Sequence, residues 1–254
     1  MEDSQRQFVA GHYGPRAADY VASAVHAEGA DLERVARDFR ERPAERVLDL
    51  GCGGGHVSYR VAPTAGMVVA CDPTEAMLQA VRQTARVRSL AAIRVAGAAA
   101  ERLPFATACF DAVLSRFSAH HWQNLRAGLA EARRVARTGA RGVFIDVVAP
   151  AEPEADSHLQ AVELLRDASH GRDYTMVEWL AALRGASFAI DAITEWPLRM
   201  EFVSWCRRTR TPAARMEGIR ALQQATSESV RRRFAIDENG SFDLGVACFS
   251  VRAV

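Results

Sequence analysis

A glycine-rich turn that directly follows a short apolar segment constrains the fold of this chain more than any other feature. Residues 46–50 (RVLDL) form a brief apolar run bounded by turn residues, which is typical of a strand covered on both faces. Gly51, Gly53 and Gly55 follow, and glycines let the backbone turn sharply and a ligand approach where a Cβ atom would collide. The pattern predicts a helix over residues 56–61 whose first N–H groups face the turn.

The spacing of these glycines separates the classes of ligand that use such turns. A dinucleotide site has the pattern G-x-G-x-x-G, and His56 occupies the third glycine position here. No G-K-[ST] follows the turn, so a P-loop is excluded. Asp49 precedes the first glycine, where its negative charge would repel a pyrophosphate. A carboxylate in this position suits a ligand with an ammonium group, such as the amino acid end of S-adenosylmethionine (SAM).

The motif D-x-G-x-G-x-G, formed by Asp49, Gly51, Gly53 and Gly55, resembles the first motif of class I SAM-dependent methyltransferases. The resemblance implies that Asp49 meets the ammonium group of SAM through water or backbone. It also implies that the glycines expose backbone to the methionine portion, with Cys52 as a small buried side chain inside the turn. The product would be S-adenosylhomocysteine (SAH).

A second acid follows residues 67–71 (MVVAC), which are predicted to form a second buried strand. The resemblance assigns Asp72 to the two ribose hydroxyl groups of SAM, with Pro73 beside it and Met77 packed on the adenine ring. A solvated turn or a helix N-cap is the alternative explanation of Asp72, because aspartate is favoured at both.

Strand and helix patterns alternate through the first part of the chain and predict right-handed βαβ units in a parallel sheet. Further strands are expected at residues 91–96, 110–115 and 141–147, with helices at 74–86 and 123–136. The predicted fold is α/β and Rossmann-like, with helices on both faces of a mostly parallel sheet. The resemblance implies seven strands, of which the last, at residues 242–251, is antiparallel.

One methyltransferase domain is expected to span residues 1–254. Its predicted parts are an N-terminal helical lid (1–44), a SAM-binding core (45–150), helical insertions on the substrate side that form a cap (151–241), and a final strand (242–254). Within the insertions we expect a strand near 188–194 and helix over most of 195–234.

Composition excludes several classes of function. With 49% hydrophobic and 25% charged residues, the chain is an ordinary globular protein. Its net charge of +1 predicts no attraction to nucleic acid, and no apolar run is long enough for a membrane span. The five cysteines contain no CxxC pair, which predicts a reduced, cytoplasmic compartment and no metal site. A monomer or a homodimer is expected.

Residues 97–105 (GAAAERLPF) resemble the methyltransferase segment G-D-A-E-x-L-P-F, which edges the adenine ring. The resemblance places Ala99, Ala100 and Glu101 at that ring. The aspartate of the family falls on Ala99, so the adenine amino group loses its charged partner. One such hydrogen bond is typically worth about 0.5–1.5 kcal/mol, so we expect weaker adenine recognition.

The loop after the fourth predicted strand carries the candidate catalytic residues. Ser115, Arg116 and Phe117 are expected under the methionine chain of SAM, and His120 and His121 follow. Imidazole titrates near neutral pH, so either histidine would serve as a general base for a phenol or an activated carbon. The alternative is that one histidine caps or braces the loop and the other binds the methionine end of SAM by hydrogen bonds, for which His121 is a candidate.

Aromatic residues supply candidates for the rest of the site. Tyr20, in the predicted N-terminal helix, is either part of a lid over the cofactor or a core residue. A larger set either lines an apolar acceptor pocket or packs in the core, namely Trp122, Tyr174, Trp196, Phe202 and Trp205. Arg116 and Arg172 would meet an anionic acceptor, although arginines more often form surface ion pairs.

The resemblance becomes narrower when the later segments are included. GGGHV (53–57), RFSAHHW (116–122) and DASH (167–170), with EW at 178–179 and TP at 211–212, are similar to the YcgJ-like branch of the UbiE-related methyltransferases. The implied function is SAM-dependent methyl transfer, by in-line displacement, to a small, apolar or aromatic molecule. A SAM- or SAH-binding regulator without methyl transfer is the alternative.

Overall fold

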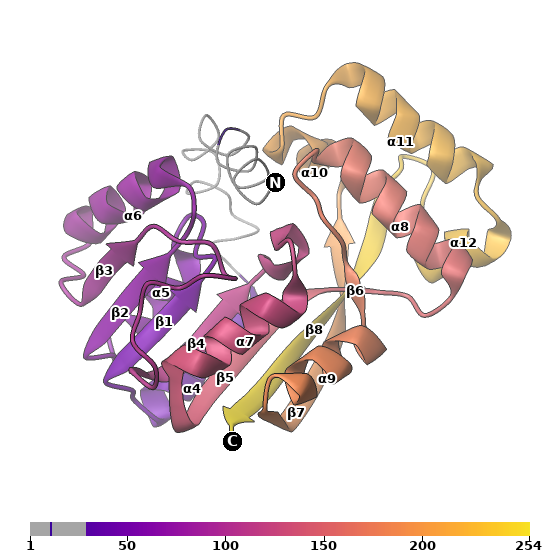
Figure 1. The fold of residues 1–254 in the computed structure, drawn as a ribbon. Coiled ribbons are helices and arrows are strands. Elements are labelled where there is room, and N and C mark those ends of the chain that lie inside the picture. Colours follow the sequence, from indigo (N-terminus) through magenta and orange to yellow (C-terminus); the bar gives the residue numbers. More distant parts are fainter. Residues whose placement is uncertain (1–10, 12–28) are drawn as a thin grey trace.

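One central sheet organises the computed structural model, which describes residue 11 and residues 29–254. Its strands run in the order β3-β2-β1-β4-β5-β8-β7 (Figure 1). The strands of this path are β1 (Arg46–Leu50), β2 (Met67–Cys71), β3 (Ile93–Ala96), β4 (Phe110–Arg116), β5 (Ala136–Ala149), β7 (Phe188–Met200) and β8 (Phe242–Ala253).

The direction of the strands confirms the predicted fold. Strand β1 pairs in parallel with both β2 and β4, and the parallel pairing continues to β3 and β5. Strand β8 is antiparallel to both of its neighbours, β5 and β7. The two-residue strand β6 (Tyr174–Thr175), which the sequence did not predict, pairs with the end of β5 beside this path.

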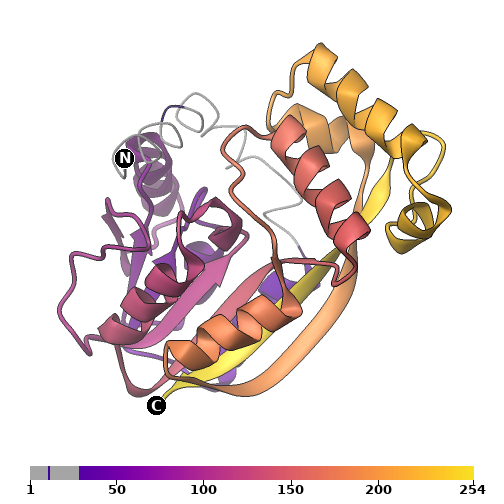
Figure 2. The ribbon, with the colours of Figure 1, turned by 45° about the vertical axis from the view of Figure 1, so that its right-hand side comes forward.

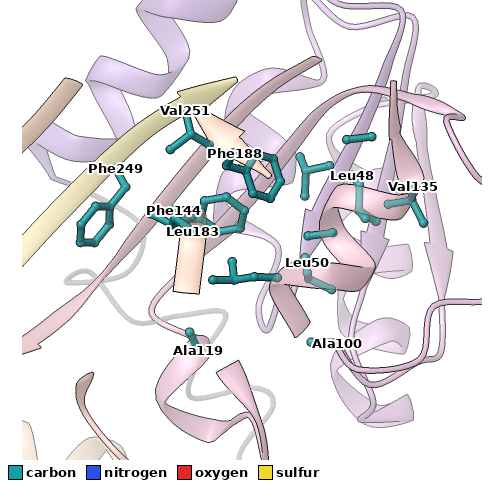
Figure 3. Close-up of a cluster of buried hydrophobic side chains, with 14 of the residues drawn as sticks. Leu48, Leu50, Ala100, Ala119, Val135, Phe144, Leu183, Phe188, Phe249 and Val251 are labelled. Carbon is teal, nitrogen blue, oxygen red and sulfur yellow. The ribbon is translucent and has the colours of Figure 1, made fainter. Parts of the chain in front are cut away.

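Helices cover both faces of the sheet because successive residues of each strand point to opposite sides. In β1, Val47 belongs to a core that also contains side chains of α4 (Ala30–Glu41), α5 (His56–Val61) and α6 (Glu75–Val87). Leu48 faces the other way, into a core completed by α7 (Leu125–Val135) and α9 (Met176–Gly185). Figure 3 shows Leu48 in this second core with Phe144 of β5 and Leu183 of α9.

The remaining described helices form a cap at one end of the long strands. They are α8 (Pro153–Arg166), α10 (Phe202–Arg208), α11 (Ala213–Ala225) and α12 (Glu228–Arg233). Figures 1 and 2 both show these helices together, away from α6. They share a third core with the nearby ends of β5, β7 and β8. No helix within the described residues is both long and apolar enough to cross a membrane.

The predicted helix over residues 195–234 is wrong at its start. Strand β7 continues to Met200, and Trp196, Leu198 and Met200 pair with Val246, Leu244 and Phe242 of β8. Every second side chain of this stretch packs against a core, which gives a strand period of two instead of the predicted helical period. Strand β5 likewise begins at Ala136, earlier than the expected residue 141.

Candidate cofactor and acceptor site

One pocket lies at the carboxyl ends of β1, β2, β3 and β4 and extends under the cap. The strand order reverses between β1 and β4, and ligands of open α/β sheets bind at such reversals. Most of the predicted site residues line the pocket, namely Asp49, Gly51, Cys52, Gly53, Asp72, Pro73, Met77, Ala99, Ala100, Glu101, Arg116, Phe117, His120 and His121.

Three predicted site residues are not placed in this lining. Gly55 has a φ of +81° at the start of α5, where a Cβ atom would meet Tyr59 and Val81, so it serves the packing of that helix. Ser115 is buried within β4. Tyr20 lies outside the described residues, as does most of the expected lid.

The first two glycines of the turn are required for different reasons. A Cβ atom on Gly51 would lie 1.7 Å from Ser118 Oγ, so the turn and the loop after β4 approach too closely for any other residue. Gly53 has no heavy atom within 4 Å of the place where a Cβ atom would lie, and it lines the pocket. Gly51 therefore joins two loops of the site, whereas Gly53 leaves space for a ligand.

This difference predicts unequal losses of stability for two matched variants. Both glycines have positive φ, so Gly51→Ala and Gly53→Ala each meet backbone strain of roughly 1–2 kcal/mol. Only Gly51→Ala also clashes with Ser118, so its free energy of unfolding should fall further. Addition of Ser118→Gly to Gly51→Ala should restore part of this lost stability. Addition of Ser118→Gly to Gly53→Ala should restore none. Chemical denaturation measures all four, and equal losses for the two single variants would contradict the packing argument.

Asp49 is held at the end of β1 by the first turn of α5. Its Oδ2 accepts hydrogen bonds from the backbone N–H of Ser58 at 3.0 Å and from Ser58 Oγ at 2.6 Å. Burial raises the pKa of Asp49 to about 6, although the bonds from Ser58 oppose this rise. The carboxylate is therefore still largely ionised at neutral pH, with one side fixed by the helix and the pocket beside it.

Asp72 connects the glycine turn after β1 to the start of α6. Its Oδ2 accepts the N–H of Gly53 and its Oδ1 accepts the N–H of Thr74, each at 2.9 Å. The side-chain hydroxyl of Thr74 also bonds to this carboxylate, so three of its roughly four acceptor positions are occupied and one remains for a ligand hydroxyl. Burial raises the pKa of Asp72 above its usual value, and the two backbone hydrogen bonds counter that effect.

The adenine-edge segment follows β3. Ala99 is partly exposed in the pocket wall, and Ala98 and Ala100 are buried on either side of it. Glu101 accepts the backbone N–H of Asn124 at 3.2 Å and so braces the start of α7. Ala99 thus presents only a methyl group to the pocket, at the position where the resemblance implies an aspartate.

Arg116 pairs with Asp31 of α4, and both side chains are almost fully buried. Its guanidinium carbon lies 4.6 Å from the centre of the Phe117 ring. Arg116 therefore connects α4 to the pocket wall. Arg172, the other arginine considered for an anionic acceptor, instead pairs with Asp156 and Glu178 and does not line the pocket.

His120 is oriented by Asp146 of β5. His120 Nδ1 lies 2.6 Å from Asp146 Oδ1, which leaves Nε2 as the ring nitrogen for a ligand in the pocket. Burial opposes the charge of His120, but the carboxylate of Asp146 outweighs it and raises the pKa to about 9. His120 is consequently an imidazolium at neutral pH and donates hydrogen bonds through both nitrogens.

His121 has the opposite electrostatic character. Burial, followed by the charge of neighbouring His120, lowers the pKa of His121 to about 3. Its Nδ1 lies 3.2 Å from the carbonyl oxygen of Ser169, so it donates a hydrogen bond to the loop after α8. A neutral imidazole with so low a pKa is a poor base, and this geometry favours the bracing role over base catalysis.

Asp146 was not among the residues that sequence reasoning selected for the site. A signal was present, because this acid lies at the end of a predicted strand, as Asp49 does. Its two oxygens accept His120 Nδ1 and three backbone N–H groups, from Ser118, Ala119 and Val147. Although ligand-type atoms of His120, Asp146 and Asp173 lie within 4.8 Å of one another, Asp146 has no lone pair left for a metal ion.

The cap side of the pocket combines apolar and ionisable side chains. Strands β7 and β8 contribute Leu198, Met200 and Leu244, and α10 contributes Trp205. The ionisable residues are Glu163, Arg166, Asp173 and Arg208, none of which the sequence singled out. Glu163 pairs with Arg166 at 3.1 Å. The four ionisable residues form no sequence motif, because they come together only when α8 and α10 pack at the end of the sheet.

The five aromatic candidates for the acceptor pocket divide into two groups. Trp122 and Trp205 line the pocket, although both are also largely buried. The other three, Tyr174, Trp196 and Phe202, are not in the lining and pack against or within the cores.

The chain is similar to known methyltransferases. A family model described as "Methyltransferase domain" matches residues 48–144. The uncharacterized protein YafE of Escherichia coli is 41% identical over 192 residues, which cover 76% of this chain and 93% of that protein. The uncharacterized methyltransferase YcgJ of Bacillus subtilis is 32% identical over 215 residues, which cover 85% of each protein.

A solved structure and a more distant relative extend the comparison. The crystal structure of Bacillus subtilis YcgJ is similar, with a TM-score of 0.83 and 29% identity over 87% of this chain and 97% of that one. A demethylmenaquinone methyltransferase of Beutenbergia cavernae is 42% identical over 109 residues, which cover 43% of each protein.

Proposed function

The chain belongs to the YcgJ-like branch of the UbiE-related, SAM-dependent methyltransferases, and from this premise we propose that it methylates a small, apolar or aromatic molecule. The observation that carries the proposal is the pocket itself. Its lining combines a glycine turn between two carboxylates, several apolar side chains of the cap side and an oriented histidine.

The residues at the carboxyl ends of β1 to β3 fit SAM. Asp49 and Asp72 offer carboxylates, and the open space at Gly53 admits a ligand against the backbone. In the proposed mode, Asp49 attracts the ammonium group and Asp72 accepts a ribose hydroxyl. Ala99, Ala100 and Met77 contact the adenine, while Arg116 and Phe117 lie under the methionine chain. SAM supplies a methyl group on a positively charged sulfur, which a nucleophile displaces in line.

The protein contributes mainly orientation and the exclusion of water. A neutral nucleophile that attacks a cation disperses charge, so proximity and alignment supply much of the acceleration. Leu198, Met200 and Trp205 hold an apolar acceptor against the cofactor side, and His120 contacts its reacting group. A quinone precursor is the acceptor that the name of the demethylmenaquinone relative suggests, and it has the expected aromatic character.

Transfer of a labelled methyl group tests this function. The protein is incubated with SAM that carries a labelled methyl group and with a small-molecule extract of bacterial cells, and the apolar fraction is analysed for label. Label in an apolar product, absent from a reaction with the Asp72→Ala variant, is expected. Binding of SAH by calorimetry without any transfer would instead favour a SAM-binding regulator.

The adenine edge offers a gain-of-affinity prediction. In Ala99→Asp a carboxylate would face the adenine amino group, and the partly exposed position has room for it. We expect SAM and SAH to bind severalfold tighter, as one hydrogen bond to a charged group allows. Ala99→Asn, which also accepts a hydrogen bond but without charge, should gain less. Calorimetry with SAH measures both, and unchanged affinity in Ala99→Asp would show that Ala99 does not face the adenine.

A further inference from the structure

Asp173 is a buried carboxyl group of the pocket without a hydrogen-bond partner for one of its oxygens. It follows the loop after α8 and is 2% exposed. Within the described residues, Asp173 Oδ2 has no hydrogen bond. His170 Nε2 lies 3.9 Å away, too far for a hydrogen bond, and bonds to Gln160 Oε1 at 3.1 Å instead. Native structures rarely leave such a group unpaired unless a water, an ion or a ligand completes it.

The surroundings of Asp173 favour its un-ionised form. Glu163 also lines the pocket and is 5% exposed, and its negative charge opposes a second carboxylate beside it. Burial, together with Glu163, raises the pKa of Asp173 well above its ordinary value, although the positive charge of His120 acts in the other direction. The charges of Glu163 and Asp146 are already matched, by Arg166 and His120 respectively. These effects favour the protonated form of Asp173, whose Oδ2 has no hydrogen-bond partner among the described residues.

We propose that Asp173 is a specificity-determining residue, which donates a hydrogen bond from its un-ionised carboxyl group to an oxygen of the methyl acceptor. Together with His120 it provides two hydrogen-bond donors on one side of a pocket whose cap side also carries Leu198, Met200 and Leu244. The acceptor class is an aromatic or apolar molecule with a hydroxyl or enol oxygen close to the methylated atom. This inference rests on the proposed function, because it assigns the acceptor oxygen of that same site.

Two substitutions separate this role from that of an ionised carboxylate. Asparagine is neutral and donates a hydrogen bond through its amide, so Asp173→Asn should keep the hydrogen bond to the acceptor oxygen. Asp173→Ala removes the donor and should lose this hydrogen bond. Asp156→Asn is a matched control, because Asp156 lies on α8 outside the pocket lining, where it pairs with Arg172. Asparagine keeps the side-chain oxygen that accepts the hydrogen bond of Gln160 Nε2, which in turn bonds to the backbone of Asp173.

The experiment measures binding of 1-naphthol and of naphthalene, which lacks the oxygen, to each protein saturated with SAH. For the wild type and for Asp156→Asn, we expect 1-naphthol to bind about tenfold tighter or more. Asp173→Asn should retain this ratio within about threefold, and Asp173→Ala should reduce it to near one. Equal affinities for the two probes in the wild type, including no measurable binding of either, would contradict the proposal. An equal loss in Asp173→Asn and Asp173→Ala would also contradict it.

Thermal melting provides a second measurement that needs no acceptor. An acid whose pKa is raised on folding destabilises the folded state at pH values above its unfolded pKa, because a proton must be bound or a charge buried. At pH 7.5, Asp173→Asn should therefore melt at the same temperature as the wild type or higher. A clearly lower melting temperature would identify Asp173 as a stabilising carboxylate and overturn the inference. Failure of SAH to bind any of these proteins, the wild type included, would contradict the proposed cofactor site and not the role of Asp173.

Discussion

Replacement of Asp72 by alanine is expected to weaken SAM and SAH binding by tenfold or more. The carboxylate has two duties, since it accepts the N–H groups of Gly53 and Thr74 and faces the pocket with its remaining lone pair. Loss of the side chain would remove the proposed partner of a ribose hydroxyl and leave two backbone donors unsatisfied. Hydrogen bonds to a charged group typically contribute about 1.5–3 kcal/mol each, which makes a tenfold loss a lower bound.

Two further variants separate binding from structure in this prediction. Asp72→Asn retains acceptance at one oxygen, so it should lose less affinity than Asp72→Ala. Glu75→Ala removes a carboxylate from the adjoining first turn of α6, where it bonds to Arg82 outside the pocket. This control should bind SAH like the wild type. Calorimetry with SAH measures all three, and an unchanged affinity of Asp72→Ala would remove the ribose assignment.

The sequence predicted the core of the fold because that core depends on local patterns. Strand β1, the glycine turn and α5 are contiguous, and a buried strand that ends in an acid can be recognised within a short stretch of sequence. The alternation of strands and helices also predicted the parallel strand directions, because βαβ units have one preferred hand, and the sheet of the structure confirms them.

Long-range convergence explains what the sequence did not provide. Glu163 and Asp173 meet His120 only because α8 folds back over the ends of β4 and β5, and no motif records that approach. The end of β7 was misassigned for a different reason. Trp196, Leu198 and Met200 alternate over too few residues to outweigh the helical reading of 195–234, and their pairing with β8 makes them a strand.

The charge of His120 is expected to make methyl transfer depend on pH with an inflection near 9. Asp146 contributes most to the rise of the pKa of this imidazole to about 9 against the effect of burial, and the negative charge of Glu163 adds to it. Below that pH, an imidazolium can hold the oxygen of an acceptor as an oxyanion. If that is its role, turnover at saturating acceptor should fall as the pH rises through about 9. A general base would give the opposite slope, because only the neutral imidazole accepts a proton.

The same pKa has a consequence for folding. A histidine whose pKa rises from 6.5 to about 9 on folding stabilises the protein fully below pH 6.5, and this contribution is lost as the pH rises through 9. The unfolding free energy of the wild type should therefore decline over this range relative to that of His120→Gln. Denaturation at pH 6, 7.5 and 9.5 measures the difference, and parallel profiles would contradict the raised pKa.

Two variants assign the inflection to the pair of His120 and Asp146. Asp146→Asn keeps a hydrogen-bonding side chain but removes the negative charge, so the pKa of His120 should fall and the inflection should move to lower pH. His120→Gln should abolish the inflection and reduce turnover, because the acceptor hydroxyl then lacks the nearby positive charge that favours its ionised form. Affinity for SAH should change little in either variant, because Asp72 and the glycine turn lie on the other side of the pocket. An inflection unmoved by Asp146→Asn would mean that another group titrates, and a turnover that climbs towards pH 9 would make His120 the base.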